Sequence, residues 1–334
     1  MTSKGEHNFY LDKHLLVTGA SGFLASNLVE TLRDTKCYIR RLSRHGSPFL
    51  PINGAASVED LSGDIAERET WQHALKGIDI VFHFAAQTSV YAASQAPAVD
   101  LAANVLPVLH MLETCREKDL HPVILFAGTV TEAGITTSLP VDETYPDDPV
   151  TLYDIHKLMA ENYLKYYVRQ GAVEGAVLRL SNVYGPGPES SRPDRGVLNS
   201  MIRKALAGEA LTVYGTGSYL RDYVYVRDVV EAFLKAGACM DRLTGHHYVI
   251  GSGKGHTVAE TVHMIAEHVA KKSGRSVPVK YVAPPGNLSP VEERNFVADT
   301  TNFSSATGWS ARTSLPDGID LTIDYFSGKI REMP

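Results

Sequence analysis

The stretch His14-Leu-Leu-Val-Thr-Gly-Ala-Ser-Gly-Phe-Leu-Ala25 places an apolar run of strand length directly before a glycine-containing turn, and a helical pattern continues to Arg33. Gly19 suits a tight turn, Gly22 lets the backbone approach a ligand closely, and Ala25 is small enough for helix–strand packing. The helix N-terminus would face an anionic pyrophosphate. An ordinary strand-to-helix turn is the alternative. The stretch predicts a dinucleotide site whose contacts are Gly19, Ser21, Gly22, Phe23 and Leu24.

Short apolar strands alternate with helical periods from His14 to about Asn182. Further strands are expected at 38–42, 79–84, 123–126 and 176–180, and helices at 98–117 and 153–170. Strands separated by helices need crossover connections, which build a parallel sheet with ligands at the carboxyl ends of its strands. The pattern predicts an α/β fold: a doubly wound, Rossmann-type parallel sheet with a smaller, interleaved C-terminal α/β domain.

The residue composition changes after Tyr184, where Gly185-Pro-Gly-Pro188 begins a loop rich in Pro, Ser and Gly that ends near Arg195. A helix is expected at 197–207 and a strand at 211–214, and strands at 223–226 and 248–250 are expected to return to the sheet. We therefore predict a dinucleotide-binding domain made of residues 1–183 and 220–254. The second domain is predicted to comprise residues 184–219 and 255–334.

The composition is that of an ordinary globular protein: 334 residues, 44% hydrophobic and 21% charged, with a formal net charge of -6. The sequence has no long run of like charges, so nothing in it indicates a nucleic-acid-binding surface. The N-terminus lacks an apolar segment of signal-peptide length, and no apolar run approaches the ~20 residues of a membrane span. We expect a soluble, cytoplasmic protein that binds neither nucleic acid nor membrane.

Thiols and histidines give no sign of a disulfide or a metal centre. Cys37, Cys115 and Cys239 are isolated in sequence, so reduced thiols are expected. His246-His247 is an adjacent pair, and adjacent strand residues point to opposite faces, so we expect no metal site.

The end of the second strand decides which dinucleotide is expected. An acid normally accepts the ribose hydroxyl of NAD there, but no Asp or Glu lies between Lys36 and Glu59. The segment instead has a basic cluster, namely Lys36, Arg40, Arg41, Arg44 and His45. A hydroxyl at Ser43 followed by the guanidinium of Arg44 suits a 2′-phosphate. NADP(H) is therefore favoured, and NAD(H) is the alternative. The segment could also be a solvated basic turn that contacts no cofactor.

Two further strand ends supply expected cofactor contacts. Gly63-Asp64-Ile65 ends the third strand, where Asp64 could accept from an adenine amino group or could cap a helix beginning at Glu67. His83-Phe-Ala-Ala86 ends the fourth strand, and its small residues leave space for a diphosphate, although a plain core strand would look similar. The expected cofactor contacts here are Asp64, Ile65, Phe84, Ala85 and Ala86, joined by Asn104 and Val183.

Three side chains carry the predicted chemistry. Thr129 puts a hydroxyl at the carboxyl end of the strand Leu125-Phe-Ala-Gly-Thr129. Tyr153 and Lys157 stand four apart in a helical segment, so they share one face. The ammonium favours the phenolate and lowers the tyrosine pKa toward a useful range. Tyr153 could then exchange a proton with a carbonyl oxygen that Thr129 also binds; a chance pair on a surface helix is the alternative.

Thr129, Tyr153 and Lys157 together resemble the Ser/Thr–Tyr–Lys triad of the short-chain dehydrogenase/reductase superfamily. The glycine pattern, Asp64, Asn104, Asn182-Val-Tyr-Gly-Pro186 and Arg221-Asp-Tyr223 are similar to its extended branch, which modifies nucleotide sugars. The resemblance implies that both Tyr153 and Lys157 contact the cofactor, that Lys157 binds the nicotinamide ribose, and that Asn104 supports the active site. It also implies a nucleotide-diphosphate sugar substrate and a homodimer.

A closer resemblance is to the NDP-hexose 4-ketoreductases, carried by Arg41-Leu-Ser-Arg44, Phe126-Ala-Gly-Thr-Val-Thr131, Tyr153-Asp-Ile-His-Lys157 and Arg195-Gly-Val-Leu198. It implies NADPH-dependent reduction of the C-4 ketone of a dTDP-4-keto-6-deoxyhexose in deoxysugar biosynthesis. In the 4,6-dehydratases an Asp and a Glu directly follow the triad threonine, but Val130 and Thr131 stand here and Glu132 comes one place late. An NAD-dependent nucleotide-sugar 4-epimerase remains the alternative, with a non-catalytic dinucleotide sensor behind it.

The resemblance also implies substrate contacts. Arg221 aligns with a diphosphate-binding arginine, and a structural ion pair with Asp222 or Asp228 is the alternative. A second arginine of the family is replaced by Ser289, and Arg294 is the substitute we consider. The expected substrate contacts are Gln87, Thr88, Thr129, Tyr153, Asn182, Val197, Leu198, Tyr214, Arg221 and Arg294.

Overall fold

The computed structural model describes residues 8–44, 49, 52–188, 196–286 and 288–328. Three segments that enter the sequence predictions lie outside these ranges. They are the N-terminal residues 1–7, His45 of the basic cluster, and loop residues 189–195 with Arg195.

A seven-stranded sheet forms the centre of the molecule, in the order β10-β6-β5-β4-β1-β2-β3. Its strands are β1 (His14–Thr18), β2 (Tyr38–Ser43), β3 (Ser57–Ser62), β4 (Ile80–His83), β5 (Val123–Thr129), β6 (Glu174–Leu180) and β10 (His247–Ile250). Every neighbouring pair is parallel. The chain runs outward from β1 to β3 and then crosses to β4, so the carboxyl ends of β1 and β4 meet at a topological switch point, where ligands bind in such sheets. The doubly wound, Rossmann-type prediction is confirmed.

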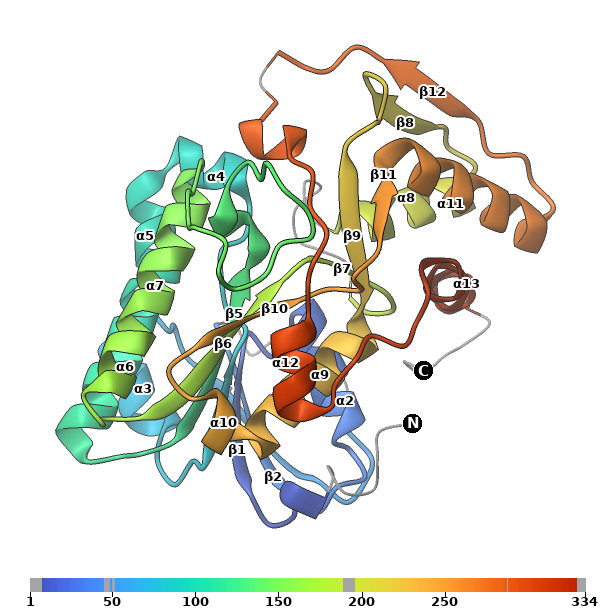
Figure 1. Ribbon diagram of the computed structural model, residues 1–334. Coiled ribbons are helices and arrows are strands. Elements are labelled where there is room, and N and C mark those ends of the chain that lie inside the picture. Colours follow the sequence, from blue (N-terminus) through green and yellow to red (C-terminus); the bar gives the residue numbers. More distant parts are fainter. Residues whose placement is uncertain (1–7, 45–48, 50–51, 189–195, 287, 329–334) are drawn as a thin grey trace.

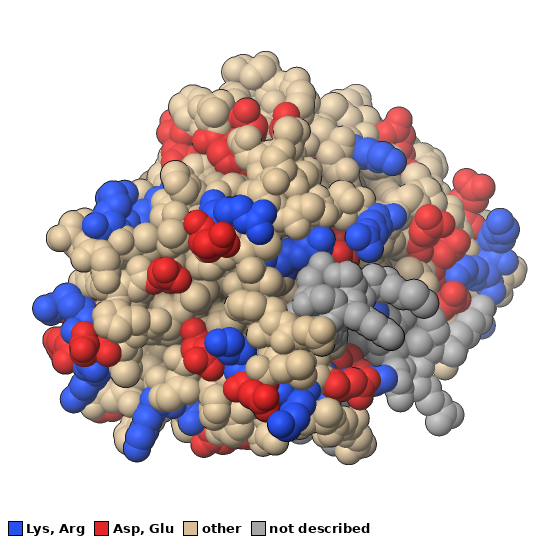
Figure 2. All heavy atoms as spheres, turned by 60° about the horizontal axis from the view of Figure 1, so that its bottom comes forward, with Lys and Arg blue, Asp and Glu red and all other residues tan. Residues whose placement is uncertain are grey.

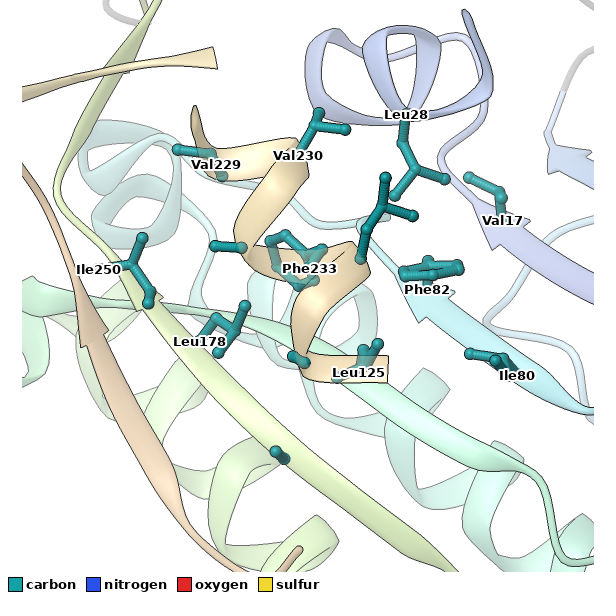
Figure 3. Close-up of a cluster of buried hydrophobic side chains, with 14 of the residues drawn as sticks. Val17, Leu28, Ile80, Phe82, Leu125, Leu178, Val229, Val230, Phe233 and Ile250 are labelled. Atoms are coloured by element: carbon teal, nitrogen blue, oxygen red, sulfur yellow. The ribbon is translucent and has the colours of Figure 1, made fainter. Parts of the chain in front are cut away.

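Helices cover both faces of this sheet (Figure 1). One face carries α3 (Arg68–Ala74), α6 (Leu106–Lys118) and α7 (Leu152–Arg169), whose buried residues share a core with Trp71, Leu112 and Phe126. The other face carries α2 (Phe23–Thr31) and α9 (Val226–Ala238). Figure 3 shows Phe233 of α9 pointing toward Phe82 and Leu125 of the sheet. The central strands β1, β4 and β5 are therefore buried on both sides, which explains their continuous apolar runs, whereas the edge strand β3 is polar and largely unburied.

A smaller part contains a second, separate core. Its sheet joins β7 (Asn182–Tyr184), β9 (Leu220–Tyr225) and β11 (Gly255–Thr257), and β8 (Leu211–Tyr214) pairs with β12 (Val279–Val282). The helices α8 (Val197–Leu206), α11 (Val258–Ser273) and α13 (Leu315–Phe326) pack on these strands. The strand expected at 223–226 is thus β9 of the small sheet, and its expected return to the main sheet is wrong. The strand at 248–250 does return there, as β10.

One late segment crosses back to the larger part. In and just after α12 (Thr301–Thr307), Phe303 and Trp309 are buried in the core of the main sheet rather than in that of the smaller part. The proposed division into residues 1–183 with 220–254 and 184–219 with 255–334 therefore remains a proposal about two interleaved parts.

The helix expected at 98–117 is interrupted. The structure has α5 (Pro97–Asn104) and then α6, which begins at Leu106. Pro107 explains the break, because its ring clashes with the carbonyl of the preceding turn and it has no N–H to donate.

Residues 97–118 also correct the expectation that no apolar stretch approaches the length of a membrane span. This one helical stretch among the described residues is long and apolar enough to cross a membrane, by length and composition alone. Half of it is buried inside the fold, and Val108, Met111 and Leu112 lie in the core between sheet and helices. A core helix passes the same test, so the stretch is weak grounds for a membrane span.

Charged side chains are dispersed. Figure 2 shows Lys and Arg interspersed with Asp and Glu on the face turned forward. Among the described residues, no group of three or more His, Cys, Asp or Glu side chains could hold a metal ion. Cys37 and Cys115 are buried, and neither they nor Cys239 form a disulfide.

Candidate active site

The glycine turn has the geometry that its sequence predicts. Gly19 lies in the left-handed region with φ +63°, and an added Cβ would stand 2.9 Å from both N and Cα of Ala85. That contact is with backbone, which cannot move aside, so glycine is required here. Gly22 is the N-cap of α2, and its N–H donates to Gly19 O at 2.7 Å. Ser21 and Gly22 are exposed at the helix N-terminus, with Phe23 and Leu24 half-buried behind them.

The loop after β4 is fixed to this turn. The N–H groups of Phe84 and Ala85 both donate to Thr18 Oγ1 at 3.1 Å. Phe84 packs edge-on against Phe233, with ring centroids 4.8 Å apart. Ala86 continues the loop, half-buried. The backbones of the two strand ends therefore lie side by side, as a cofactor diphosphate between them requires.

Tyr153 and Lys157 lie on the buried face of the first turns of α7. The helix begins there because the Thr151 side chain caps it, accepting from Asp154 N–H at 3.2 Å. Lys157 Nζ donates to Ala127 O at 2.7 Å and lies 3.9 Å from the Phe126 ring centroid. Burial lowers the pKa of Lys157 to about 8, against the pull of Glu132, Glu161 and Asp100. Its ammonium is thus fixed between β5 and α7, close to the phenol in sequence and on the same face.

Thr129 ends β5 and begins a short 3₁₀ turn, η1 (Val130–Ala133). Its Oγ1 lies 2.8 Å from Thr131 Oγ1, and its N–H donates to Glu132 Oε1 at 3.2 Å. Thr131 in turn donates to Asp154 Oδ1. Strand β5 and helix α7 thus meet through a set of hydroxyls and one carboxylate, and sequence reasoning missed both Thr131 and Asp154 as members of it.

Glu132, which comes one place late after the triad threonine, lies in a cluster of buried ion pairs. Glu132 is fully buried and its second carboxylate oxygen faces Arg179 Nε at 3.0 Å. Arg179 also pairs with Glu161 at 2.7 Å and with Asp147 at 2.5 Å. Burial next to Glu161 raises the pKa of Glu132 well above its ordinary value. Glu132 caps the turn beneath Thr129 and is unavailable as an acid beside the triad.

A second network supports the loop after β4. Asn104, at the end of α5, accepts from Gln87 N–H at 3.0 Å and donates to Gln87 O at 2.9 Å. The Gln87 amide donates to Asp100, and Asp100 Oδ2 lies 2.6 Å from His156 Nδ1 on α7. The side chain of Gln87 is therefore used inside the protein, and Asn104 fixes the active-site loop. Asp100 and His156 were missed, because nothing in their spacing shows that they meet. Thr88 follows Gln87 and is exposed.

The basic cluster at the end of β2 is neutralised by β3. The parallel register places Arg40 beside Glu59 and Arg41 beside Asp60. Arg41 binds Asp60 through two nitrogens, at 2.6 and 2.9 Å, and Arg40 Nε lies 2.6 Å from Glu59. Arg41 is buried in this ion pair, so it is not available to a 2′-phosphate. The basic cluster next to Ser43 and Arg44 therefore carries less uncompensated positive charge than its sequence indicates.

Ser43 is the last residue of β2 and Arg44 follows it, and their side chains lie in different surroundings. Ser43 Oγ is buried and has no hydrogen-bond partner among the described residues, whereas Arg44 is exposed. A buried hydroxyl without a partner costs free energy unless a ligand satisfies it. Its place at the strand end fits a hydroxyl of a dinucleotide ribose.

Asp64 lies beyond β3, exposed, and its side chain accepts from Ala66 N–H at 2.9 Å. Helix α3 begins at Arg68 with Glu67 as its N-cap, so Asp64 does not cap it. Ile65 is half-buried against the core, and its carbonyl accepts from Trp71 Nε1 at 2.8 Å. Asp64 remains free to meet an adenine.

The structure brings Arg221 and Arg294 together. Arg221 donates to the carbonyls of Glu292 and Arg294 and forms an ion pair with the Glu292 carboxylate at 3.5 Å, whereas no ion pair joins it to Asp222 or Asp228. Arg294 is buried, its Nε has no partner among the described residues, and burial beside Arg221 lowers its pKa to about 10. Two adjacent guanidiniums with an unsatisfied donor fit a diphosphate.

The other predicted substrate residues lie around the smaller part. Asn182, in β7, donates to Asp222 O at 3.1 Å, and Val183 packs against the main core. Val197 and Tyr214 are about half exposed, at 52% and 51%, whereas Leu198 is buried in the second core. Val197 and Tyr214 can therefore contact a ligand, while Leu198 mainly packs.

The family model for the NAD dependent epimerase/dehydratase family matches residues 15–251, which is more than half of the chain. This chain belongs to that family. It is an enzyme of the extended short-chain dehydrogenase/reductase type, as the triad and the glycine turn predict.

Three similar proteins cover almost the whole chain. A putative UDP-glucose 4-epimerase of Methanocaldococcus jannaschii is 28% identical over 318 residues, 95% of this chain and 99% of that protein. The crystal structure of the Thermotoga maritima UDP-glucose 4-epimerase with UDP-glucose is 29% identical, with a TM-score of 0.83, and covers 95% of this chain and 99% of that chain. The Thermus thermophilus UDP-glucose 4-epimerase in complex with NAD is 30% identical, with a TM-score of 0.81, and covers 95% of this chain and 100% of that chain.

These comparisons correct the predicted reaction. The prediction of an NADPH-dependent ketoreductase of dTDP-4-keto-6-deoxyhexoses is wrong, because the similar proteins are named 4-epimerases and one is a complex with NAD. The closer resemblance to 4-ketoreductases and the NADP preference find no support. The argument from Ser43 and Arg44 used the residues of one turn alone, and that is too little to decide which dinucleotide binds.

Proposed function

We propose that this protein is an NAD-dependent epimerase that inverts C-4 of a uridine diphosphate hexose. The observation that carries the proposal is the full-length similarity to UDP-glucose 4-epimerases, including one complex with UDP-glucose and one with NAD. The ion pair between Arg41 and Asp60 reduces the positive charge beside Ser43 and Arg44, on which the argument for NADPH relied. The unpartnered Ser43 hydroxyl is available to the ribose of either dinucleotide.

The side chains fit both halves of such a reaction. Bound NAD supplies the chemistry of taking a hydride from the sugar carbon and returning it. Tyr153 accepts the proton of the C-4 hydroxyl and later gives it back, while the Lys157 ammonium stabilises the phenolate. Thr129 binds the same oxygen and so fixes its position. Lys157 also suits a hydrogen bond to the nicotinamide ribose.

Inversion needs a second property: the keto sugar must present its other face to a fixed cofactor. Arg221 and Arg294 are proposed to hold the diphosphate while the keto sugar turns in the site. Asn182, Val197 and Tyr214 are proposed to contact the diphosphate and the base.

Elimination of water is less well supported. A dehydratase needs an acid and a base beside the triad threonine, but Val130 is buried, Thr131 is bonded to Asp154, and Glu132 faces Arg179. The proposal therefore favours inversion over dehydration.

The test is incubation of the purified protein with UDP-glucose and separately with UDP-galactose, with the products separated by chromatography. We expect interconversion without added cofactor and NAD released from the denatured protein. Net consumption of added NADH or NADPH, or no inversion of either sugar, would contradict the proposal.

We further propose a homodimer formed through α5 and α7. These helices expose large apolar side chains, Val99 at 65%, Tyr166 at 50%, Ile155 at 39% and Met159 at 37%. A molar mass in solution near twice 36.4 kDa is expected by light scattering, and a mass of one chain would contradict it.

A further inference from the structure

Arg179, in β6, binds two acids and leaves a third without a donor. Its side chain gives two hydrogen bonds to Glu161, from Nε at 3.0 Å and from Nη2 at 2.7 Å. Two more go to Asp147, from Nη1 at 2.5 Å and from Nη2 at 3.1 Å. Glu132 Oε2 lies 3.0 Å from the same Nε, but Nε has a single proton and gives it to Glu161. Glu132 Oε2 therefore has no hydrogen-bond partner among the described residues.

An ionised Glu132 would be costly in this place. The side chain is fully buried, and a buried carboxylate oxygen without a donor loses its hydration and gains no hydrogen bond in return. Burial, followed by the charge of Glu161, raises the pKa of Glu132 well above its ordinary value, against the pull of Arg179. A proton on Oε2 removes the cost, because the oxygen then becomes a donor. Its other oxygen, Oε1, can still accept from Thr129 N–H, at 3.2 Å.

Glu161 is the partner that can accept this proton. Its Oε1 accepts from Lys165 Nζ at 2.5 Å and from Arg179 Nη2, while its Oε2 accepts from Arg179 Nε and keeps a second lone pair. The two carboxyl groups lie within hydrogen-bonding reach of each other, which adds to the raised pKa of Glu132. Burial would raise the pKa of Glu161, but hydrogen bonds from His247 and Arg179 hold it well below its ordinary value. A single proton shared by the pair would thus lie on Glu132.

We propose that Glu132 is a positioning residue that works as an uncharged acid: it donates to Glu161 and thereby holds the Thr129 main chain at the end of β5. The inference rests on the proposed function, because Thr129 acts there through the sugar oxygen that it binds. Donation to Glu161 fixes the orientation of the Glu132 carboxyl group, so Oε1 stays in place to accept from Thr129 N–H. The main chain of Thr129 fixes in turn where its hydroxyl meets the C-4 oxygen. The proton of Glu132 itself stays where it is throughout the reaction.

The uncharged acid also affects Lys157. Burial lowers the pKa of Lys157, and a negative charge on Glu132 would raise it. An uncharged Glu132 exerts no such pull, so an uncharged replacement should leave the pKa of Lys157 where it is. The other charged and titratable groups that face the acid pair or Lys157 are Lys165 of α7, Arg179 of β6, His247 of β10, Asp147 of the loop before α7, Asp100 of α5 and His83 of β4.

Infrared spectroscopy of the purified protein with its cofactor tests the proton directly. A protonated carboxyl group has a carbonyl band that a carboxylate lacks. We expect this band at neutral pH in the difference spectrum between the wild type and Glu132→Gln, whose amide can keep both hydrogen bonds of the acid. Glu143→Gln is the matched control, because Glu143 accepts from Val249 N–H and from Asn302 Nδ2 and so needs no proton. A band in the control spectrum instead, or none in the Glu132→Gln spectrum, would overturn the proposal.

Thermal unfolding gives a second test, and the raised pKa of Glu132 fixes its sign. A proton bound more tightly by the folded state stabilises that state at low pH, and this contribution is lost as pH rises from the ordinary glutamate pKa of about 4.3 to the raised pKa of folded Glu132. The unfolding temperature of the wild type should therefore fall relative to that of Glu132→Gln between about pH 5 and about pH 9. Gln adds an amide proton without an acceptor, which shifts the comparison by a constant amount. A difference that stays constant with pH, or that grows in favour of the wild type, would contradict an uncharged Glu132.

Kinetics test the link to Thr129. Glu132→Met keeps the length of the side chain but cannot accept from Thr129 N–H, so kcat for UDP-hexose inversion should fall about tenfold with KM nearly unchanged. Glu132→Gln should rescue kcat to within about threefold of the wild type and keep the alkaline limb of the pH profile within about 0.3 pH unit. If Glu132 were charged, its replacement would remove a pull on Lys157 and move that limb to lower pH. Such a move, or a Glu132→Met protein with wild-type kcat, would overturn the proposal. Circular dichroism shows whether Glu132→Met folds; if it does not, the infrared spectrum and the Glu132→Gln profile decide.

Failure of the proposed function looks different. It would appear as a wild-type protein that inverts neither sugar, whatever its infrared spectrum. The infrared and unfolding measurements need no substrate, so they still decide where the proton lies. The variants are then compared in the reduction of a UDP-4-keto-hexose by NADH, followed by nicotinamide absorbance, because Thr129 would bind the sugar oxygen there too. Equal rates for Glu132→Met and Glu132→Gln would overturn the link to Thr129 independently.

Discussion

The sequence predicted ligand-contacting side chains at the ends of two strands of the central sheet, β5 and β2, and the two predictions had different outcomes. At the end of β5, Thr129 meets α7, and the side chains that the sequence predicts lie on the expected buried face. At the end of β2, Ser43 and Arg44 were expected to meet a 2′-phosphate, and the two preceding arginines of the basic cluster, Arg40 and Arg41, are paired with carboxylates of β3. The first prediction used spacing within one helix, whereas the second used the charge of one segment.

The difference shows which properties belong to a segment alone. Residues four apart in a helix share a face whatever surrounds the helix. The charge that a ligand meets depends instead on the neighbouring strand. Here the register pairs Arg40 with Glu59 and Arg41 with Asp60, so two of the four Lys and Arg side chains of the cluster are compensated by β3. The substitutions and the pH dependence described next test this difference between the two strand ends.

Tyr153→Phe should have the largest effect. Removing the phenolic hydroxyl removes the group that exchanges a proton with the C-4 oxygen, so kcat should fall about 10³-fold. Product formation from UDP-glucose measures it, and the NAD content and thermal midpoint of the variant should match the wild type. A kcat within about tenfold of the wild type would show that the β5–α7 corner has been misassigned.

Arg294→Met tests the proposed diphosphate anchor. Loss of one charge-assisted hydrogen bond should raise KM for the UDP-sugar about 10- to 100-fold, with a smaller change in kcat. Lys254→Met removes an exposed positive charge in the same part of the chain and is the matched control. Equal KM changes in the two variants would reduce the role of Arg294 to general electrostatics.

The pH dependence follows from Lys157. Burial lowers the pKa of Lys157 to about 8, so the ammonium loses its proton as pH rises through that value. The phenolate of Tyr153 is then less stabilised, and kcat should fall up to about tenfold per pH unit above pH 8. A kcat that stays level to pH 10 would contradict this assignment.

Asp60→Asn should have the smallest effect, and it tests the β2–β3 corner directly. It frees Arg41 from its ion pair, so the ratio of NADP to NAD affinity should rise about three- to tenfold. Glu59→Gln frees Arg40 instead, which lies on the opposite side of the strand and contacts carbonyls near α3, so the ratio should stay constant. Titration of the cofactor-free proteins measures both.

The sequence was informative where the information is local. Alternation of apolar strands and helices predicted the main sheet, and φ +63° at Gly19 agrees with the requirement for glycine there. The sequence was silent where distant segments meet. Arg294 reaches Arg221, and Thr131 reaches Asp154, only through the fold. The position of β9 was missed for the same reason, because strand patterns do not state which sheet a strand joins.

The central claim is that a hydride leaves C-4 and returns to it within one site. The direct measurement uses UDP-glucose labelled with deuterium at C-4, incubated with the purified protein in ordinary water and analysed by NMR. The account predicts UDP-galactose that retains its deuterium at C-4, with no net change in nicotinamide absorbance. Deuterium replaced by solvent hydrogen at C-4 would contradict it.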